Sequence, residues 1–294
     1  MPARRFAIAT AGDDRYLGLL QGLVLSVRSH AAGAEAPIVV LDVGLGAEAR
    51  DWLAQAGARC VAPEWDHAFG RPMPDYYKAM VSRPHLPRYV HGAETIVWLD
   101  ADCWVQDWGA VELLLAGAAA AGFAIAPELD RSYSPFYEGA PYPAHLRSWY
   151  RACFDEETAE RLGDYPLLNC GVFAARVGAP HWRAWAELLS GSLRRTALFV
   201  SEQTALNVAL RSGGLPCSLM PSGCNWICYR ALPACSEDGR VLLDPQLPHA
   251  PLGIVHLAGF PLEAKDTPRT LRTPGGGVAT RPLTYMPPPH VPPP

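Results

Sequence analysis

Short apolar runs alternate with segments of helical periodicity along most of this 294-residue chain. Residues 5–10 and 37–42 have the length and the apolar character of buried strands. Between them, residues 16–30 carry apolar side chains three and four positions apart, which predicts an amphipathic helix. A repeated strand–helix–strand order predicts an α/β fold with a mostly parallel, doubly wound sheet and helices on both faces. In such sheets, ligands bind beyond the carboxyl ends of the strands.

The alternation continues to about residue 265, so we expect a single domain over residues 1–265. Further strands are expected at 58–63, 95–100, 122–127, 167–175 and 253–259, and further helices at 47–57, 181–193 and 201–214. Residues 266–294 are rich in Pro and Gly, with seven prolines in the last fourteen positions. We therefore expect a disordered or polyproline tail there. It is either a dispensable extension or a weak docking segment for a partner.

Composition narrows the classes of protein that need consideration. With 49% hydrophobic residues against 18% charged ones, the chain can bury a large core and is not expected to be disordered. The 25 basic residues are scattered rather than clustered, so no nucleic-acid partner is expected. Asp13 and Asp14 interrupt the first apolar stretch too early for a secretory leader. The longest apolar run, from Leu113, is shorter than the roughly 20 residues of a membrane span. We expect a cytoplasmic protein.

Eight cysteines without a leader indicate reduced thiols rather than a disulfide framework. Four of them, Cys217, Cys224, Cys228 and Cys235, lie close together in the sequence. Their spacing lacks the paired C-x2-C units of structural zinc sites, which favours buried or incidental thiols over a zinc site.

Two acidic residues stand where an apolar strand ends. Asp100 and Asp102 follow the run "TIVWL", and side chains two positions apart in an extended segment point the same way. Paired carboxylates suit Mg²⁺ or Mn²⁺, which completes its coordination shell with water and phosphate oxygens. The spacing therefore indicates a divalent-cation site. The alternative is a pair of solvated loop residues beyond a strand end.

The Asp-x-Asp pair is one of six segments that follow one another in a characteristic order along the chain. They are "AIATAGDDRYLGLLQGLVLSVRSH", "YYKAMVSRPHLPRYV", "WLDAD", "LLNCGVF", "SEQTALN" and "VHLAG". From about Phe6 to about Gly259, this order resembles glycosyltransferase family 8, the glycogenin and bacterial galactosyltransferase group. The resemblance implies the GT-A fold, an α/β architecture.

The resemblance also implies roles for individual residues. The metal ligands for Mn²⁺ or Mg²⁺ would be Asp100, Asp102 and His256. The catalytic candidates, placed beside the donor sugar or its anomeric carbon, are Asn169, Glu202 and Gln203. The candidates for binding the donor are Thr10, Tyr16, Lys78, Arg83, Asp100, Ala101, Gly171 and Gly259.

Several of these residues have a purely structural alternative. His256 could be a hydrogen-bonded core histidine, Tyr16 a core aromatic, and Glu202 an ordinary acid in a first helical turn. Asn169 could serve only neighbouring backbone groups. The family places a diphosphate-binding lysine about six residues beyond its histidine, whereas Lys265 is nine beyond His256. A phosphate role for Lys265 thus departs from the family pattern.

The implied reaction transfers a hexose from a UDP-sugar, with retention of anomeric configuration, to an unidentified acceptor of saccharide, lipid or protein type. A saccharide-type acceptor is expected, because sugars present apolar C–H faces to aromatic rings. A stretch over 130–165 is rich in such rings, and the alternative is that they belong to the core. They are Tyr133, Phe136, Tyr137, Tyr142, Trp149, Tyr150, Phe154 and Tyr165.

Three other functions fit parts of the sequence. A nucleotidyltransferase of related fold would carry a Gly-rich phosphate loop with a basic residue after the first strand, and "TAGDDRY" lacks one. A phosphatase with an Asp-x-Asp nucleophile would place the motif on the first strand. A non-catalytic protein that binds nucleotide sugars or carbohydrates would keep the fold without turnover.

Overall fold

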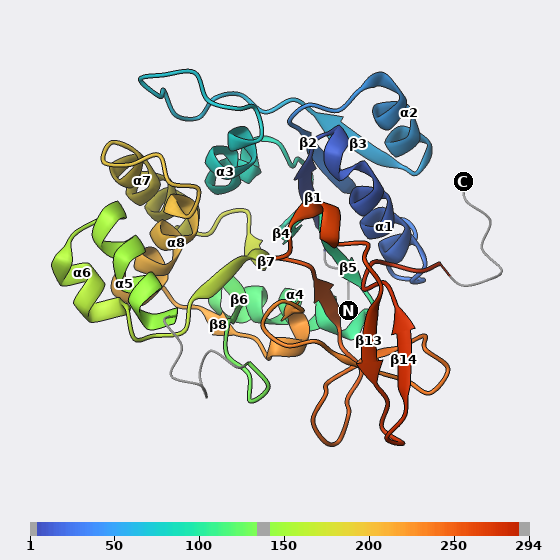
Figure 1. Cartoon of the computed structure of the whole chain (residues 1–294). Coiled ribbons are helices and arrows are strands. Elements are labelled where there is room, and N and C mark those ends of the chain that lie inside the picture. The colour runs from blue at the N-terminus through green and yellow to red at the C-terminus, as the bar shows by residue number, and fades with distance from the viewer. Residues whose placement is uncertain (1–4, 134–141, 288–294) are drawn as a thin grey trace.

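The centre of the molecule is a seven-stranded sheet with the strand order β3-β2-β1-β4-β7-β6-β8. This computed structural model describes residues 5–133 and 142–287 (Figure 1). The strands are β1 (Phe6–Gly12), β2 (Ile38–Asp42), β3 (Ala58–Val61), β4 (Thr95–Leu99), β6 (Phe123–Pro127), β7 (Leu168–Arg176) and β8 (Ser218–Leu219).

Most neighbouring strands of this sheet are parallel, as the sequence predicts. β1 pairs in parallel with both β2 and β4, while β7 runs antiparallel between β4 and β6. The carboxyl ends of β1 and β4 therefore meet the amino end of β7 at one edge of the sheet. Asp100 and Asp102 follow β4 at this edge.

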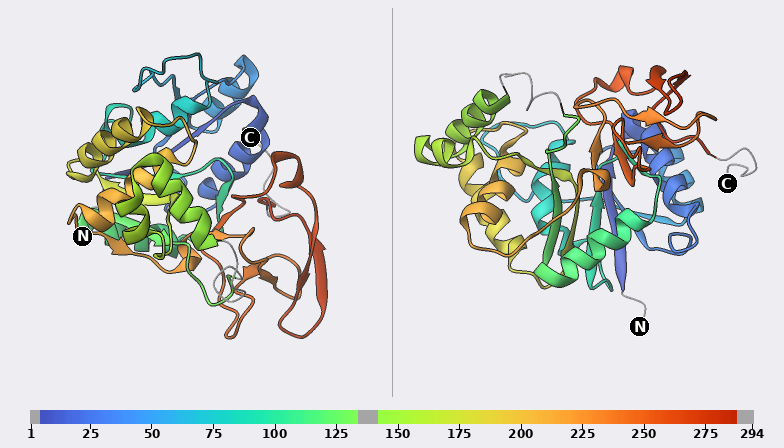
Figure 2. Two further views of the ribbon diagram at one scale, coloured as in Figure 1. Left: turned by 60° about the vertical axis from the view of Figure 1, so that its left-hand side comes forward. Right: turned by 90° about the horizontal axis from the view of Figure 1, so that it is seen from below.

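Helices cover both faces of the sheet (Figure 2). The helices α1 (Leu17–Arg28), α2 (Ala47–Gln55) and α4 (Gly109–Ala121) pack on one face, and α3 (Tyr77–Ser82), α7 (His181–Leu193) and α8 (Ser201–Ser212) on the other. Side chains alternate along a strand, so Val97 and Leu99 enter the first core while Ile96 and Trp98 enter the second. This double covering explains the near-continuous hydrophobicity of β4.

The aromatic-rich stretch contains two helices that periodicity did not reveal. They are α5 (Tyr142–Cys153) and α6 (Glu156–Leu162), which lie beside α8 in Figure 1. Asp155 caps α6 by accepting a hydrogen bond from the backbone N–H of Thr158. Tyr150 is 1% exposed and packs with Leu146 and Leu162 in a small core of its own.

A second, smaller sheet brings segments that are distant in the sequence to the edge of the central sheet where Asp100 and Asp102 lie. It has the order β5-β12-β9, with β5 (Cys103–Val105), β12 (Ile254–His256) and β9 (Trp226–Ile227). β12 runs antiparallel to β5, so that His256 lies opposite Cys103. Beyond it, β10 (Ala234–Cys235) pairs with β11 (Leu242–Leu243). Short 3-10 turns are η1 (Asp14–Tyr16), η2 (Arg83–Arg88), η4 (Ser222–Cys224) and η5 (Leu262–Ala264).

The segment after residue 265 is ordered further than its composition predicts. β13 (Arg269–Arg272) and β14 (Val278–Arg281) form an antiparallel hairpin. Leu271 and Leu283 are each 1% exposed in a core with Trp104, whose Nε1 donates to the Leu283 carbonyl over 2.8 Å. The expectation of disorder from residue 266 is therefore corrected up to residue 287, because buried leucines anchor the chain there. Residues 288–294, with most of the prolines, lie outside the described residues.

Within the described ranges, no helix combines the length and the apolar character needed to cross a bilayer. The eight cysteines are free thiols.

Candidate functional site

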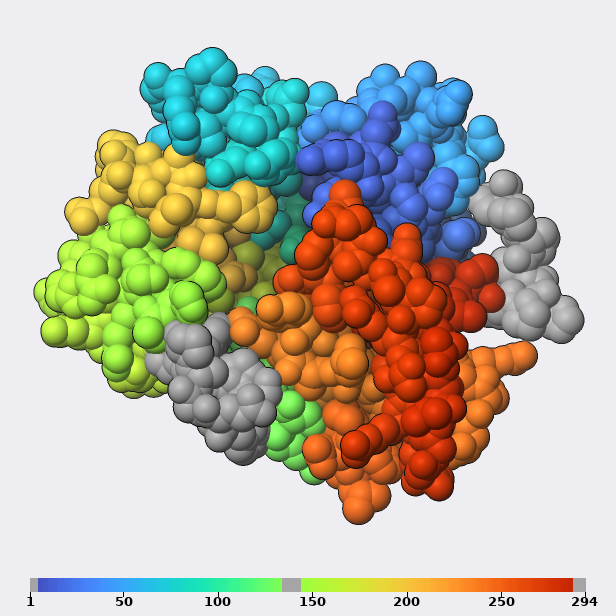
Figure 3. Space-filling view, viewed as in Figure 1, coloured from blue at the N-terminus to red at the C-terminus, as the bar shows by residue number. Residues whose placement is uncertain are grey.

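A cavity of about 660 Å³ opens at the carboxyl ends of β1 and β4. Its lining comes from the turn after β1, the end of β4, the start of β7, the start of α8 and the segment after β12. In Figure 3 the hollow lies between the teal, blue, gold and orange segments near the centre of the face shown. Ligand pockets of ordinary proteins have volumes of roughly 300–1,000 Å³, so the space suits a nucleotide-sized molecule.

Both aspartates of the Asp-x-Asp pair lie at the base of this cavity. The Asp100 backbone N–H donates to the Gly171 carbonyl over 2.8 Å, which ties the turn to β7. The Asp100 Oδ1 accepts from Trp98 Nε1 at 2.8 Å and from Arg83 Nη2 at 2.9 Å. The Asp102 Oδ2 accepts from Lys265 Nζ at 2.7 Å. These cations and donors offset the cost of placing two carboxylates at the end of a core strand.

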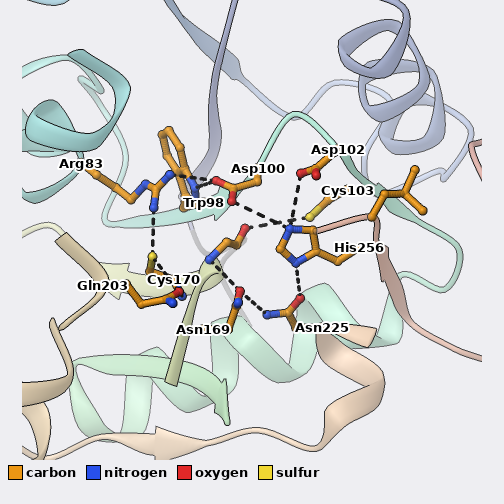
Figure 4. A network of polar contacts seen from close by, with 12 residues as sticks. Arg83, Trp98, Asp100, Asp102, Cys103, Asn169, Cys170, Gln203, Asn225 and His256 are labelled. Carbon is orange, nitrogen blue, oxygen red and sulfur yellow. Dashed lines mark hydrogen bonds and ion pairs between the residues drawn. The ribbon is translucent and has the colours of Figure 1, made fainter. Parts of the chain in front are cut away.

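His256 lies beside the two carboxylates, and its side chain is 1% exposed (Figure 4). Its Nδ1 lies 2.8 Å from Asn225 Oδ1. Its Nε2 lies 3.4 Å from Asp102 Oδ1 and 3.8 Å from Asp100 Oδ2. Among the described residues, this buried Nε2 has no hydrogen-bond partner. A buried ring nitrogen without a hydrogen-bond partner, together with two carboxylates, forms a set of atoms of the kind that binds a divalent cation.

This set of side chains fits a divalent metal. Ligand atoms of Asp102, Cys103 and His256 lie within 4.8 Å of one another, the one such group among residues 5–133 and 142–287. Burial raises the pKa of the Cys103 thiol well above its usual value, and a thiol is a soft ligand, whereas hard divalent cations prefer oxygen ligands. Burial would also raise the pKa of Asp102, but His256 and Lys265 outweigh it and hold that pKa well below its ordinary range. Asp102 and His256, with Asp100 beside them, are therefore the better ligands.

A buried ion pair forms the wall next to the metal ligands. Arg83 is 7% exposed, and its Nη1 donates to Glu202 Oε2 at 2.9 Å. Its guanidinium also lies over the Trp98 ring, 4.7 Å from the ring centroid. Burial raises the pKa of Glu202, and the positive charge of Arg83 offsets this only in part. Glu202 Oε1 is buried without a hydrogen-bond partner among the described residues.

Two further polar side chains complete this wall. Cys170 Sγ donates to Glu202 Oε2 at 3.0 Å, and Gln203 Oε1 accepts from the Cys170 backbone N–H at 3.0 Å. Asn169 also lines the cavity, yet its amide groups already bond to Glu128, Gly171 and Asn225. The structure thus shows Asn169 as a hydrogen-bonded member of the framework.

The structure brings most of the predicted site residues to the cavity. Its lining includes Tyr16, Arg83, Asp100, Ala101, Asp102, Asn169, Gly171, Glu202, Gln203, His256 and Gly259. Lys265 joins them despite its unusual spacing. Periodicity did not single out Arg15, Tyr76, Phe199 and Phe260, which also line it.

Thr10 and Lys78 do not belong to the described lining of this cavity. Thr10 is fully buried and shares with Ile8 the strand face that packs under α1. Lys78 instead pairs with Asp75 at 3.0 Å and lies over the Trp65 ring. The basic residue of this segment that reaches the site is Arg83.

The aromatic stretch over 130–165 does not line the cavity either, as far as its described side chains show. Tyr133 is fully buried, and Tyr165 is 53% exposed at another surface. Phe136, Tyr137 and the side chain of Tyr142 lie outside the described part of the structure. The rings near the cavity mouth are instead Tyr76 and Phe199, whose centroids lie 6.1 Å apart.

Gly171 permits the close approach of the ligands. A Cβ at this position would lie 2.3 Å from His256 Cε1 and 2.7 Å from Asp100 Oδ2. Gly171→Ala is therefore expected to displace these side chains and, if the set holds a divalent cation, to weaken its binding by at least about tenfold, as loss of ligand orientation usually does. Titration with Mn²⁺ checks this. The control is Gly178→Ala, because a Cβ there meets nothing within 4 Å. Equal Mn²⁺ affinity of the two variants would contradict the expectation.

A comparison with solved structures supports the fold described above. No protein-family model and no curated protein matches the sequence. The galactosyltransferase LgtC, solved with donor and acceptor sugar analogs, is similar with a TM-score of 0.54 and 16% identity, over 86% of this chain and 87% of LgtC. The bifunctional glycosyltransferase WbbM has a TM-score of 0.55 and 13% identity, over 88% of this chain and 46% of WbbM. Mouse xyloside xylosyltransferase 1 has a TM-score of 0.52 and 10% identity, over 86% and 98%. The chain has a GT-A-type fold that resembles glycosyltransferase family 8, as expected from the sequence.

Proposed function

We propose that this chain is a metal-dependent glycosyltransferase that moves a hexose from a UDP-sugar to an acceptor with retention of configuration. One observation carries the proposal. The orphaned Nε2 of buried His256 faces Asp100 and Asp102 at the base of the cavity. In a GT-A-type fold, this edge of the sheet is where a ligand is expected. Mn²⁺ or Mg²⁺ would be held by these three side chains.

The charges around the cavity suit a diphosphate next to that ion. When bound, the cation supplies Lewis-acid stabilisation of the departing diphosphate, which contributes several kcal/mol in metal-assisted reactions. Lys265, 5% exposed, and Arg83 add fixed positive charge at the base of the same cavity. Arg15 and Tyr16, in η1 just before α1, line the cavity near the turn after β1 and would bind the nucleoside end.

The reacting sugar would lie beside the start of α8. Arg83 holds the Glu202 carboxylate next to the cavity, and Gln203 lies beside it. Should the reaction pass through a covalent intermediate, Glu202 would be the nucleophile. Tyr76 and Phe199 at the mouth offer apolar ring faces to an incoming saccharide-type acceptor.

A screen of nucleotide sugars tests the proposal. Purified protein is melted with UDP-glucose, UDP-galactose and other UDP- and GDP-sugars, with and without Mn²⁺. A ligand that binds only the folded state raises the melting temperature by mass action. We expect a rise for a UDP-sugar that requires Mn²⁺, accompanied by slow release of UDP. Binding without UDP release would favour the non-catalytic alternative, and no shift with any nucleotide sugar would remove the proposal.

Metal binding is expected to weaken as the pH falls. Burial opposes protonation of His256, but the charges of Asp102 and Asp100 outweigh it and raise the pKa of the ring above its ordinary value of 6.5. The protonated ring cannot bind a metal, so affinity is lost as the pH falls through this raised pKa. Asp102 stays ionised over the same range because its pKa is lowered. Mn²⁺ titrations from about pH 8 to about pH 6 check this, since only histidines normally titrate there. A constant affinity would contradict it.

A further inference from the structure

A buried chain of hydrogen bonds ends at the ring of His256 (Figure 4). Asn225 Oδ1 lies 2.8 Å from His256 Nδ1, and Asn225 Nδ2 lies 3.0 Å from Asn169 Oδ1. Asn169 Nδ2 in turn lies 2.9 Å from Glu128 Oε1. Each of these four side chains belongs to a residue that is 7% exposed or less. No water competes easily for such groups, so their donors and acceptors must match one another.

The donor and acceptor roles in this row of hydrogen bonds are set by Glu128, at the end farthest from His256. Glu128 accepts from Arg230 Nε at 3.0 Å and from Arg230 Nη2 at 2.7 Å, as an ionised carboxylate paired with a guanidinium does. An ionised carboxylate only accepts hydrogen bonds. Asn169 must therefore turn its NH₂ group toward Glu128 and its oxygen toward Asn225.

A second contact fixes the same orientation independently. The backbone N–H of Gly171 donates to Asn169 Oδ1 at 3.0 Å, and a backbone N–H cannot accept. The oxygen of Asn169 is thus identified by two neighbours, which excludes a flipped amide. Asn225 must then donate its NH₂ group to Asn169 and present Oδ1 to His256. That oxygen can only accept, so His256 Nδ1 must carry the proton.

We infer that Asn225, oriented by Asn169 and Glu128, holds neutral His256 in the tautomer with the proton on Nδ1. The lone pair of the ring then lies on Nε2, the atom that faces Asp100 and Asp102. Asn225, Asn169 and Glu128 are positioning residues, because they act on the site through the ring of His256. The tautomer is inferred from the hydrogen bonds alone. Its benefit for metal binding rests on the proposed function.

The tautomer can be measured directly on the metal-free protein. ¹⁵N NMR of histidine-labelled protein at alkaline pH, where the ring is neutral, distinguishes a protonated Nδ1 from a protonated Nε2. The signal of His256 is identified by its loss in His256→Gln. We expect Nδ1–H. A proton on Nε2 in the unaltered protein would overturn the inference.

Two substitutions at one position separate hydrogen bonding from packing. Asn225→Asp keeps an acceptor for Nδ1–H and loses only the bond that Asn225 Nδ2 donates to Asn169 Oδ1, while Asn225→Leu has a similar volume and neither group. We expect the Asp variant to keep the Nδ1–H tautomer and its Mn²⁺ affinity. The Leu variant should show a mixture of tautomers and bind Mn²⁺ about 10–100-fold more weakly, the usual loss when a partner of a ligating histidine is removed. Circular dichroism confirms that each variant is folded.

The outcomes separate this inference from the proposed function. An Nδ1–H ring that responds to Asn225→Leu, in a protein that binds no Mn²⁺, would support the inference and count against the metal-dependent reaction. An Asn225→Leu variant with an unchanged tautomer would overturn the role of Asn225, whatever the protein catalyses.

Discussion

Asp102→Asn is expected to reduce hexose transfer by at least about 100-fold while the protein stays folded. The carboxylate is one of the ligands of the proposed cation, and an amide neither neutralises nor holds the ion as well. A loss of several kcal/mol of transition-state stabilisation corresponds to roughly 10²–10³ in rate. UDP release from the donor identified by the screen, measured at saturating Mn²⁺, checks this. The same variant should also show reduced Mn²⁺ affinity by direct titration.

The control for this variant is Asp51→Asn. Asp51 is an exposed residue of α2, so this substitution removes the same charge far from the cavity and should leave the rate unchanged. Asp102→Asn also removes the carboxylate that pairs with the buried Lys265. Its melting temperature is therefore measured alongside, so that a loss of folded protein is not mistaken for a loss of chemistry. An Asp102→Asn protein that is folded and retains Mn²⁺-dependent transfer would remove the metal role.

Arg83→Met is expected to lower the free energy of unfolding by about 3–5 kcal/mol, the usual effect of removing one partner of a buried ion pair. Glu202 is 3% exposed and would keep a charge without its guanidinium partner. Asp100 would also lose its bond to Arg83 Nη2. Urea unfolding at neutral pH measures the effect, with unchanged slope as the sign that the folded and unfolded states remain comparable.

A second substitution tests this explanation. Glu202→Gln removes the unmatched charge, so the double variant should recover part of the loss. Arg83 normally lowers the pKa of Glu202, so in the single variant that pKa rises further. A folded-state pKa above the unfolded one means that stability is lost as the pH rises through it. Arg83→Met alone should therefore regain stability as the pH falls. A double variant that is less stable than the single one would contradict the ion-pair explanation.

Strongly periodic segments were predictable from the sequence alone. The predicted helix at 181–193 has the bounds of α7, and the strand predicted at 95–100 differs from β4 only in its last residue. The amphipathic stripe of α7 is buried in one core, and the apolar run of β4 is buried in both cores. In these segments local pattern and tertiary packing agree, which is why simple periodicity sufficed.

Elements whose stability comes from distant contacts were not predictable in this way. η2 contains Pro84 and Pro87, which hide its helical character, although it is the turn that directs Arg83 inward. The β13–β14 hairpin depends on Leu271 reaching a core built from residues far back in the chain. Its segment is dominated by Pro, Gly and Thr, which carry no periodic pattern.

The same distinction applies to the site. The Asp-x-Asp pair has a local spacing that points to a cation, so Asp100 and Asp102 could be proposed without a structure. Asn225 and Glu128 show no such spacing. Asn225 contacts His256 and Glu128 contacts Asn169, each from a separate segment of the chain. Lys78 and Arg83 lie in one short stretch, and only the backbone path of α3 and η2 decides which of them faces the cavity.

The pairing of β12 with β5 sets the order in which this protein can mature. The acidic pair leaves the ribosome before its histidine partner, because β12 follows β4 and β5 in the chain. A nascent chain that ends before β12 can form much of the central sheet but has no imidazole for the ion. Binding of the proposed cation would thus have to wait for the synthesis of β12, and products truncated before β12 would lack one of its three ligands.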